Sequence, residues 1–339
     1  MKLLIKKNKV SDFCIYRNNE VTVVDGVLTI GEKSYSHNEK ESVFSENGVL
    51  YEYLDSSIFV FDGNSFVKKK CEWSISYFFD SGSWIERDRD EEFFYAKYFE
   101  NEEEKLRLQI PTKMLLDCRW RSEDVLVLND VVEYKTIYFY SKSGEKLWEY
   151  KVEEPDVKIE INSILVVGNV VIICCLRRLR KHSVEGFNIH TGEKHWGYYG
   201  DDVRCGRNYM AADDGMVYGI YMRESEKDRE KVLLCVEKIE PISGVSDLYI
   251  VKEDTRDLEV YQWLASISDM KLYYSDDRPG CSIGVVDLKT MSLIDDCHLQ
   301  LKKAGSYGLE KPIVIGDKLY AYSRETEELL FLKNKDYEL

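Results

Sequence analysis

Strand-like segments separated by tight turns recur along the whole chain. Two of them share one pattern: 138–150 (YFYSKSGEKLWEY) and 187–199 (FNIHTGEKHWGYY) each contain a short strand, a Gly turn followed by Glu-Lys, and a second strand with a Trp. The two glycines, Gly144 and Gly192, are about 48 residues apart, as are the two tryptophans. A period of this length is typical of the blades of a β-propeller, each of which is one small antiparallel sheet.

Weaker copies of this hairpin occur at similar steps on both sides of the first two. They are 58–67 with a turn at Asp62-Gly63, 94–108 with Asn101, 236–250 with Ser243-Gly244, 283–294 with Lys289-Thr290, and 318–332 with Glu325-Thr326. Further strands precede most of the hairpins, at 124–128, 164–167, 210–212 and 313–315. Each repeat is therefore a small antiparallel meander of strands.

A meander of this size cannot bury both of its faces alone, so we expect the repeats to stack around a ring. The predicted fold class is an all-β β-propeller of seven blades, with eight blades as the alternative. We expect residues 1–339 to form one domain in which 41–335 hold the blade repeats. Residues 1–40 contain a hairpin-like segment, 21–35, that does not match a full repeat. We expect them to supply one or two outer strands to the last, shortened blade and so to close the ring.

One segment favours a helix by its composition. Residues 225–240 (SEKDREKVLLCVEKIE) begin with a helix-start Ser and contain many good helix formers. The repeat period places 232–239 in a strand instead. We follow the period and predict a strand there.

The turn pattern of Gly-Glu-Lys followed by a Trp, at 143–148 and 191–196, resembles the repeat of quinoprotein-type, or PQQ-like, β-propellers. The aspartate that often ends the strand before the turn in that family occurs here only as Asp62 and Asp287. The resemblance implies a propeller scaffold and is silent on chemistry.

The quinone enzymes of that family are exported, bind Ca²⁺ beside the cofactor, and in some cases close a disulfide between adjacent cysteines over the quinone. Cys174 and Cys175 are adjacent in this chain. However, 170–176 is predicted as a strand, in which neighbouring side chains point to opposite faces. We therefore expect no quinone, no other cofactor and no metal, and we expect both cysteines to act as small apolar residues.

Composition and charge favour a protein of the cytoplasm. The apolar run at 3–5 is followed at once by two lysines, too short for a secretory signal, and no other run approaches the length of a membrane helix. Nine cysteines, scattered singly except for one pair, suit a reducing compartment. The net charge of −15 repels phosphate backbones and anionic lipids. We therefore expect a monomer that binds a basic protein, and neither nucleic acid nor membrane.

Catalytic and metal-binding motifs are missing from the sequence. It contains no Cys-x-x-Cys pair, no Gly-rich phosphate-binding signature and no nucleophile elbow. His190 and His195 flank one Gly turn, but two histidines without a third ligand make a poor metal site. Acidic pairs are too common along the chain to single out one as catalytic. We therefore expect a binding protein and not an enzyme.

The long connections predict a candidate binding face. In a four-stranded meander, the connection between the second and third strands and the connection between blades leave at the same end, opposite the Gly turns. The longer ones are 80–92, 153–160, 177–185, 200–208, 223–231 and 275–282. Loops carry function more often than strands, and 80–92 mixes an aromatic residue with charges, as interface hot spots do. The candidate partner-binding residues are Trp84, Arg87, Asp88, Asp90, Glu91, Glu154, Asp156, Asp201 and Asp202.

Two functions stay open from the sequence. The first is a protein-binding propeller whose acidic face captures a basic partner. Its most concrete form is an immunity protein that caps a basic toxin, such as a nuclease, in the cell that makes it. The second is an enzyme or small-ligand binder that uses the central channel, where strands of all blades converge. We favour the first because the motifs of catalysis are missing.

Overall fold

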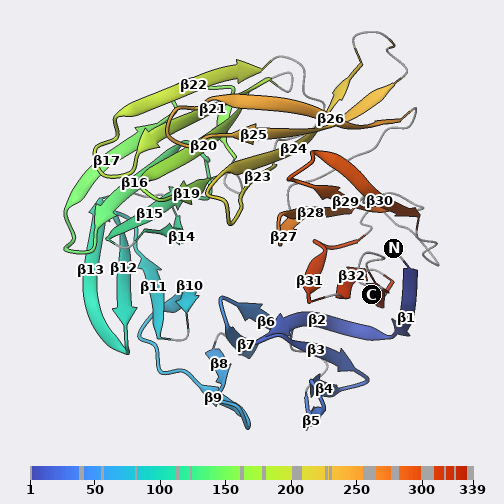
Figure 1. The fold of residues 1–339 in the computed structure, drawn as a ribbon. Coiled ribbons are helices and arrows are strands. Elements are labelled where there is room, and N and C mark those ends of the chain that lie inside the picture. Colours follow the sequence, from blue (N-terminus) through green and yellow to red (C-terminus); the bar gives the residue numbers. More distant parts are fainter. Residues whose placement is uncertain are drawn as a thin grey trace. The chain divides into compact units, whose positions relative to one another are not determined.

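All regular elements in the described part of the chain are β-strands, which form eight antiparallel sheets in a computed structural model (Figure 1). The structure describes residues 2–37, 42–54, 57–80, 82–111, 115–122, 124–160, 164–177, 181–200, 208–225, 228, 231–254, 265–275, 282–298, 309–316, 318–323 and 326–333. The chain divides into two units, Lys9–Lys151 and Met1–Asn8 with Val152–Leu339, and each contains four of the described sheets. The predicted all-β β-propeller fold is confirmed, with each sheet as one blade.

The unit of residues 9–151 holds blades 1 to 4, each a meander of four strands in chain order. Blade 1 consists of β2 (Val10–Tyr16), β3 (Asn19–Val24), β4 (Val27–Ile30) and β5 (Lys33–Ser36). Blade 2 consists of β6 (Val43–Glu46), β7 (Val49–Leu54), β8 (Ser57–Phe61) and β9 (Phe66–Lys68). Blade 3 consists of β10 (Ser74–Asp80), β11 (Ser83–Arg89), β12 (Phe93–Glu100) and β13 (Glu103–Pro111). Blade 4 consists of β14 (Leu116–Arg121), β15 (Val125–Asp130), β16 (Thr136–Ser141) and β17 (Lys146–Lys151).

The other unit holds blades 5 to 8. In blade 5, two short strands, β18 (Val157–Ile159) and β19 (Leu165–Val167), both pair with β20 (Val170–Arg177), which is followed by β21 (Lys181–Asn188) and β22 (Lys194–Gly200). Blade 6 consists of β23 (Asn208–Ala211), β24 (Val217–Glu224), β25 (Val232–Ile239) and β26 (Ser246–Asp254). Blade 7 consists of β27 (Ala265–Ser268), β28 (Lys271–Ser275), β29 (Ser282–Asp287) and β30 (Ser292–His298). Blade 8 consists of β31 (Ile313–Ile315), β32 (Lys318–Ser323), β33 (Glu328–Lys333) and β1 (Lys2–Asn8).

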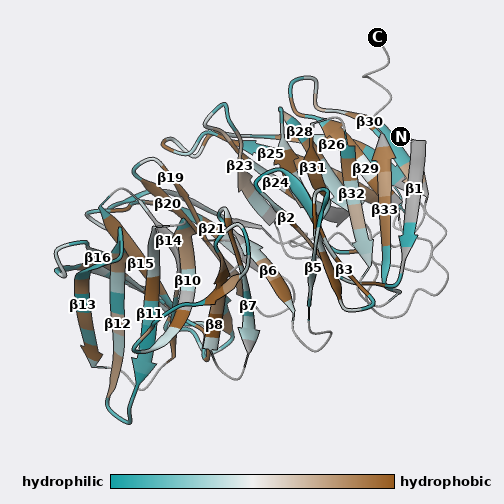
Figure 2. Cartoon of the chain, turned by 90° about the horizontal axis from the view of Figure 1, so that it is seen from below, coloured by the Kyte–Doolittle hydropathy of each residue, from teal (hydrophilic) through white to brown (hydrophobic). Residues whose placement is uncertain are grey.

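Strand β13 illustrates why the blades stack on one another. Leu106, Leu108 and Ile110 are buried and alternate with exposed residues, because successive side chains of a strand point to opposite faces. These three side chains join residues of blade 4, among them Leu126 and Leu128, in one apolar cluster. Burying such a side chain contributes about 1.5–3 kcal/mol. Figure 2 shows apolar brown along the strands and hydrophilic teal at many of the turns.

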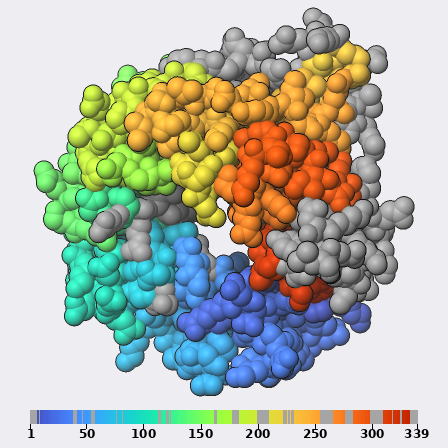
Figure 3. All heavy atoms as spheres, viewed as in Figure 1, coloured from blue at the N-terminus to red at the C-terminus, as the bar shows by residue number. Residues whose placement is uncertain are grey.

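Neighbouring blades of a unit contact each other through their first strands. In residues 9–151, β6 contacts β2 and β10, and β10 also contacts β14. In the other unit, β23 contacts β19 and β27. Blades 6 and 7 also meet at their fourth strands, where Lys252 of β26 pairs with Asp296 of β30. Figure 3 shows the orange surface of blade 6 adjoining the red-orange surface of blade 7.

Three blades of the unit that contains residues 152–339 share a pairing of an aromatic ring with a glycine on the adjacent strand. The pairs are Gly186 with Trp196, Tyr209 with Gly219, and Tyr274 with Gly284. A Cβ atom at Gly284 would lie 2.0 Å from Cζ of Tyr274, so only glycine leaves room for this buried ring. The ring in turn covers backbone that glycine would expose.

The structure corrects the predicted number of blades and the predicted role of the N-terminal strands. Eight blades are present in the described part of the chain, in place of the seven predicted from the repeats. Residues 10–36, which were expected to close the last blade, form blade 1 themselves. A shorter segment, β1, supplies the fourth strand of blade 8 by pairing with β33. Blade 1 was missed because its turns are so short that its four strands span fewer residues than the repeat period.

The smaller predictions about strands and turns have mixed outcomes. Residues 232–239 form strand β25, so the period predicted the structure correctly where composition favoured a helix. The turns at Asn101, Gly144, Gly192 and Gly244 each join the third and fourth strands of a blade, as predicted. The predicted turn at 325–326 falls between β32 and β33, the second and third strands of blade 8. The prediction that it joins the third and fourth strands of a blade was therefore wrong. The error follows from the fourth strand of that blade coming from the other end of the sequence.

Pairing of β1 with β33 should account for a measurable part of the stability of blade 8. Deleting residues 2–8 removes roughly six backbone hydrogen bonds of about 0.5–1.5 kcal/mol each, so we expect the free energy of unfolding to fall by about 3 kcal/mol or more. Urea denaturation followed by circular dichroism measures this loss. A circular permutant that carries residues 2–8 behind residue 339 on a flexible linker should regain most of it. A deletion as stable as the full chain would show that the strand is dispensable.

Glu160 is a titratable group placed against the strands of blade 5. It follows β18, and its backbone N–H donates to the carbonyl oxygen of Cys174 at 2.9 Å. Burial raises the pKa of the Glu160 carboxyl to about 7. An acid whose pKa is higher in the folded state than in the unfolded state binds more protons when folded, so stability falls as the pH rises between the two values.

Replacing Glu160 by Gln should therefore stabilise the protein increasingly as the pH rises from about 4.5 to about 7. We expect Glu160→Gln to match the parent protein near pH 4.5 and to exceed it at pH 8, by about 3 kcal/mol at most, because each pKa unit corresponds to about 1.4 kcal/mol. Urea denaturation at a series of pH values measures the difference. Glu153→Gln, at an exposed position nearby, is the control and should show no such trend. A pH-independent effect of Glu160→Gln would contradict the argument.

Candidate functional site

Blade 3 presents a short acidic turn at the end where its second and third strands meet. Residues 90–92 join β11 to β12, and the connection 69–73 enters the blade from blade 2 at the same end. The third and fourth strands turn at Asn101, at the opposite end. In this blade the connection between the second and third strands and the connection from the preceding blade therefore lie at the same end, as predicted.

The predicted long loop 80–92 is mostly a strand, β11, and this corrects the role of Trp84. Trp84 is only 3% exposed and packs with Val49 and Tyr51 of blade 2. Its ring stacks on Phe99 with centroids 4.8 Å apart and planes 4° apart. The alternation along β11 turns Trp84 into the space between blades 2 and 3, so this side chain contributes to the core and not to a contact surface.

Arg87 also serves the fold in a way that the sequence did not predict. Its Nη1 donates to the carbonyl oxygen of Leu116 at 3.2 Å and lies 3.4 Å from Oδ1 of Asp117, both on β14. Its side chain is 30% exposed. Arg87 thus ties blade 3 to blade 4, and this leaves it a smaller role at a partner surface than the sequence suggested.

Asp90 shapes the acidic turn. Its Oδ1 accepts the backbone N–H groups of Glu92 and Phe93, both at 2.8 Å, and its Oδ2 accepts the hydroxyl of Tyr95 at 2.7 Å. These three hydrogen bonds, with that of Glu92 first, hold the pKa of the Asp90 carboxyl below its usual value. The bond to Asp90 also raises the pKa of Tyr95. Asp90 is therefore a carboxylate at neutral pH, and the turn keeps one shape.

Aromatic rings stand beside this turn, and the sequence did not predict them. Asp88 pairs across the strands with Tyr95, whose ring centroid is 5.9 Å from that of Trp73 and 6.3 Å from that of Phe93. All three rings are half-buried. We define the acidic–aromatic site as Trp73, Asp88, Asp90, Glu91, Glu92, Phe93 and Tyr95. Three of the four acids, Asp88, Asp90 and Glu91, were named from the sequence. The rings were missed because two of them lie on strand β12 and the third lies in a short connection, and a search for long loops finds neither.

Two buried charged residues, Glu86 and Lys97, hold the segment that contains Trp73 in place. Glu86, 1% exposed, accepts the backbone N–H groups of Glu72 and Trp73 at 3.2 Å through Oε2, and the indole N–H of Trp84 at 3.3 Å through Oε1. Lys97 lies opposite Glu86 in the strand register, is also 1% exposed, and pairs with Glu72. Buried charges are tolerated when they are paired and hydrogen-bonded in this way.

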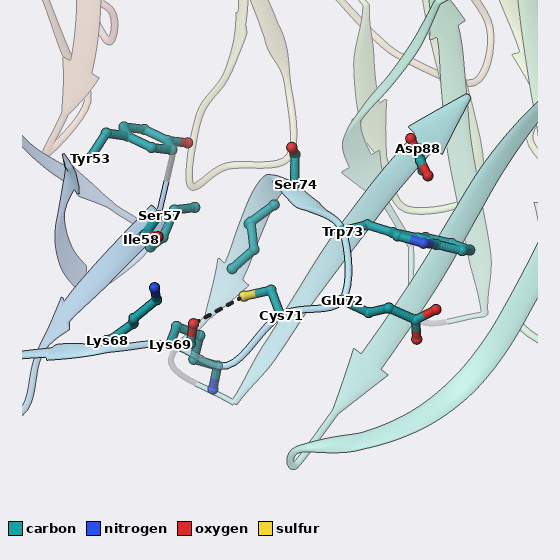
Figure 4. Close-up of a pocket in the computed structure, with 11 residues that line it drawn as sticks. Tyr53, Ser57, Ile58, Lys68, Lys69, Cys71, Glu72, Trp73, Ser74 and Asp88 are labelled. Atoms are coloured by element: carbon teal, nitrogen blue, oxygen red, sulfur yellow. Dashed lines mark hydrogen bonds between the residues drawn. The ribbon is translucent and has the colours of Figure 1, made fainter. Parts of the chain in front are cut away.

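A pocket of about 600 Å³ opens next to Trp73, between blades 2 and 3. Its lining includes Tyr53, Lys68, Glu72, Trp73 and Asp88, which are drawn in Figure 4. Two of these residues belong to the ends of strands in blade 2 and the others to blade 3 or the connection into it. Burial raises the pKa of the lining thiol of Cys71 to about 11, so that thiol stays protonated at neutral pH.

The remaining predicted site residues belong to other parts of the chain. Glu154 and Asp156 are exposed and lie in the connection from β17 to β18, as predicted, although 157–159 form a strand. Asp201 and Asp202 lie outside the described residues. Among the predicted site residues, the structure thus brings together Asp88, Asp90 and Glu91 at one end of blade 3.

Other features of the described residues bear on chemistry. No group of three or more His, Cys, Asp or Glu among them could hold a metal ion. The described part also has no helix of the length and apolar character that a membrane crossing requires. Cys174 and Cys175 are buried and adjacent in strand β20, as the strand prediction required.

Comparison with known proteins gives a likeness of fold alone. No protein-family model matches the chain, and no curated protein sequence matches it either. The solved structure of Sqt1 from Saccharomyces cerevisiae is similar with a TM-score of 0.57 at 12% identity, over 98% of each chain. BamB from Moraxella catarrhalis has a TM-score of 0.44 at 10% identity, over 98% of this chain and 99% of that one. A europium-containing methanol dehydrogenase has a TM-score of 0.43 at 12% identity, over 76% of this chain and 51% of that one. Identities this low say nothing about partners or activity.

The contacts of Glu86 predict a specific loss on neutralisation. We expect Glu86→Gln to lower the free energy of unfolding by about 1–3 kcal/mol, because the amide is a weaker acceptor for three N–H groups and removes a charge opposite buried Lys97. The matched control is Glu104→Gln on the exposed pair with Arg107, which should cost no more than about 1 kcal/mol. Urea denaturation of both variants measures the difference. Equal losses would show that Glu86 has no special role.

Proposed function

We propose that this protein is a non-enzymatic, cytoplasmic β-propeller that binds a basic protein partner through the acidic–aromatic site. The observation that carries the proposal is the placement of exposed Asp88, Glu91 and Glu92 beside the half-buried rings of Trp73 and Tyr95 at one end of blade 3. Trp and Tyr are enriched among the residues that dominate binding energy, and carboxylates around them select a positively charged partner.

The charge of the whole chain supports the same partner. A net charge of −15 attracts a basic protein over a distance and speeds its association, and it repels nucleic acids and anionic membranes. At the same time the three hydrogen bonds to Asp90 keep the acidic turn in one shape before binding. A pre-shaped site loses less conformational freedom when it binds, which favours affinity.

The most concrete form of this proposal is an immunity protein that neutralises a basic toxin, such as a nuclease, inside the cell. An acidic cap would cover the cationic surface that such a toxin needs for its anionic substrate. This version requires the partner to lose its activity on binding. The other possibility raised by the sequence, a ligand or substrate in the central channel, stays a prediction.

Reversing charges at the acidic turn should weaken partner binding. We expect Glu91→Lys/Glu92→Lys to bind the partner captured from native lysate at least tenfold more weakly, a loss of about 1.4 kcal/mol or more. Binding by the parent protein should also weaken as salt rises. Biolayer interferometry with the purified partner at two salt concentrations measures both effects.

The control variant makes the same change of charge in turns of two other blades. Glu32→Lys/Glu193→Lys alters two exposed acids in turns between third and fourth strands, and it should leave affinity within about threefold of the parent value. Equal losses for the two double variants would refute the acidic–aromatic site, and an acidic partner would refute the proposed function. A partner whose enzymatic activity continues in the complex would refute the immunity version alone.

A further inference from the structure

The wall of the pocket formed by Trp73 already binds cations of the protein itself. Nζ of Lys97 lies 3.9 Å from the centroid of the Trp73 ring, and Cζ of Arg107 lies 5.6 Å from it. Lys97 is buried and paired with Glu72, so its contact helps to fix the orientation of this indole. The ring is also half-buried and lines the open pocket, where a further cation can approach it.

Carboxylates flank the same indole within the pocket. Asp88 and Glu72 both line it, and in the view of Figure 4 they lie above and below the ring of Trp73. The side chain of Glu72 is 63% exposed although it pairs with Lys97. Asp88 is exposed, and its Oδ1 accepts the backbone N–H of Arg89 at 2.8 Å. The second ring, that of Tyr95, stands 5.9 Å from Trp73 at an interplanar angle of 50°.

The lysines of the pocket do not oppose a cation at this wall. Nζ of Lys69 lies 3.8 Å over the ring of Trp84 and pairs with Glu102 at 3.2 Å, so it is already occupied. Lys68 belongs to β9 of blade 2, and Figure 4 shows it across the pocket from Trp73 and Asp88. The pocket therefore has a cationic wall on blade 2 and an aromatic, anionic wall on blade 3.

The geometry points to the wall of Trp73, Tyr95, Asp88 and Glu72 as a receptor for an arginine side chain of the basic partner. This inference rests on the proposed function and names the chemical group that the site recognises. A guanidinium is planar, stacks on an indole and presents a fork of N–H donors to carboxylates beside the ring. A lysine ammonium is more strongly hydrated and offers no flat face to stack, so it should bind this wall more weakly.

Two labelled peptides of equal charge test the inference. Fluorescence anisotropy with the full chain should show that fluorescein-labelled nona-arginine binds about tenfold more tightly than nona-lysine. Trp73→Leu should reduce this preference to about threefold or less, and Trp73→Tyr, which keeps an aromatic face, should retain most of it. Asp88→Asn should weaken nona-arginine at least threefold. The matched control is Trp148→Leu, which removes an indole stacked on Phe139 in blade 4 and should leave the preference unchanged.

The outcomes separate this inference from the proposed function. A preference that survives both Trp73→Leu and Asp88→Asn, or that is absent in the parent protein, would overturn the arginine receptor. If, in that case, Glu91→Lys/Glu92→Lys still weakens the natural partner, the basic-partner function stands without it. Asp88→Asn alters an exposed side chain, so an unchanged affinity of this variant for nona-arginine also overturns the inference, even where Trp73→Leu lowers stability. Urea denaturation of each variant checks the stability.

Discussion

The alternation of side chains along each strand is the constraint on which this structure depends. It gives every blade two faces that need cover, and a single meander covers neither of them. In blade 3, Phe94, Ala96 and Tyr98 pack toward blade 4, while Trp84 and Phe99 point toward blade 2. Both faces of blade 3 are thus covered by neighbouring blades of its unit. A chain that repeats one module supplies such cover, and the repeat period in the sequence reflects this need.

Packing between blades 2 and 3 changes character from one end to the other, and the site follows from that change. At one end Trp84 and Phe99 stack on each other, and Trp84 is only 3% exposed. Further along the same face, Glu86 and Lys97 lie opposite each other as a buried row of charged residues, and Glu86 also accepts backbone N–H groups of the incoming connection. Where this row ends, the blades no longer fill the space between them and the pocket opens. The groups that shape the pocket are therefore continuous with the core and are rigidly supported by it.

The fold itself leaves the function open, because propellers serve many purposes on one scaffold. What distinguishes this chain is its acidity and the meeting of carboxylates with half-buried rings at the end of blade 3. The features have complementary physical effects, since charge acts over a distance and the rings act on contact. Together they support the proposed recognition of a cationic protein surface.

The sequence by itself determined the fold class, the strand at 232–239 and most of the turns, because these depend on local periodicity and turn chemistry. It also determined the acidity and named Asp88, Asp90 and Glu91 as candidates, although within a predicted loop of 80–92 that is mostly strand. The tertiary structure decided the rest. The count of blades depended on residues 10–36 forming a compact blade of their own, which is shorter than the repeat period. The burial of Trp84 depended on which face of β11 meets a neighbouring blade, and a search for loops cannot find that face. The half-buried position of Trp73 depended on the contact of its connection with Glu86.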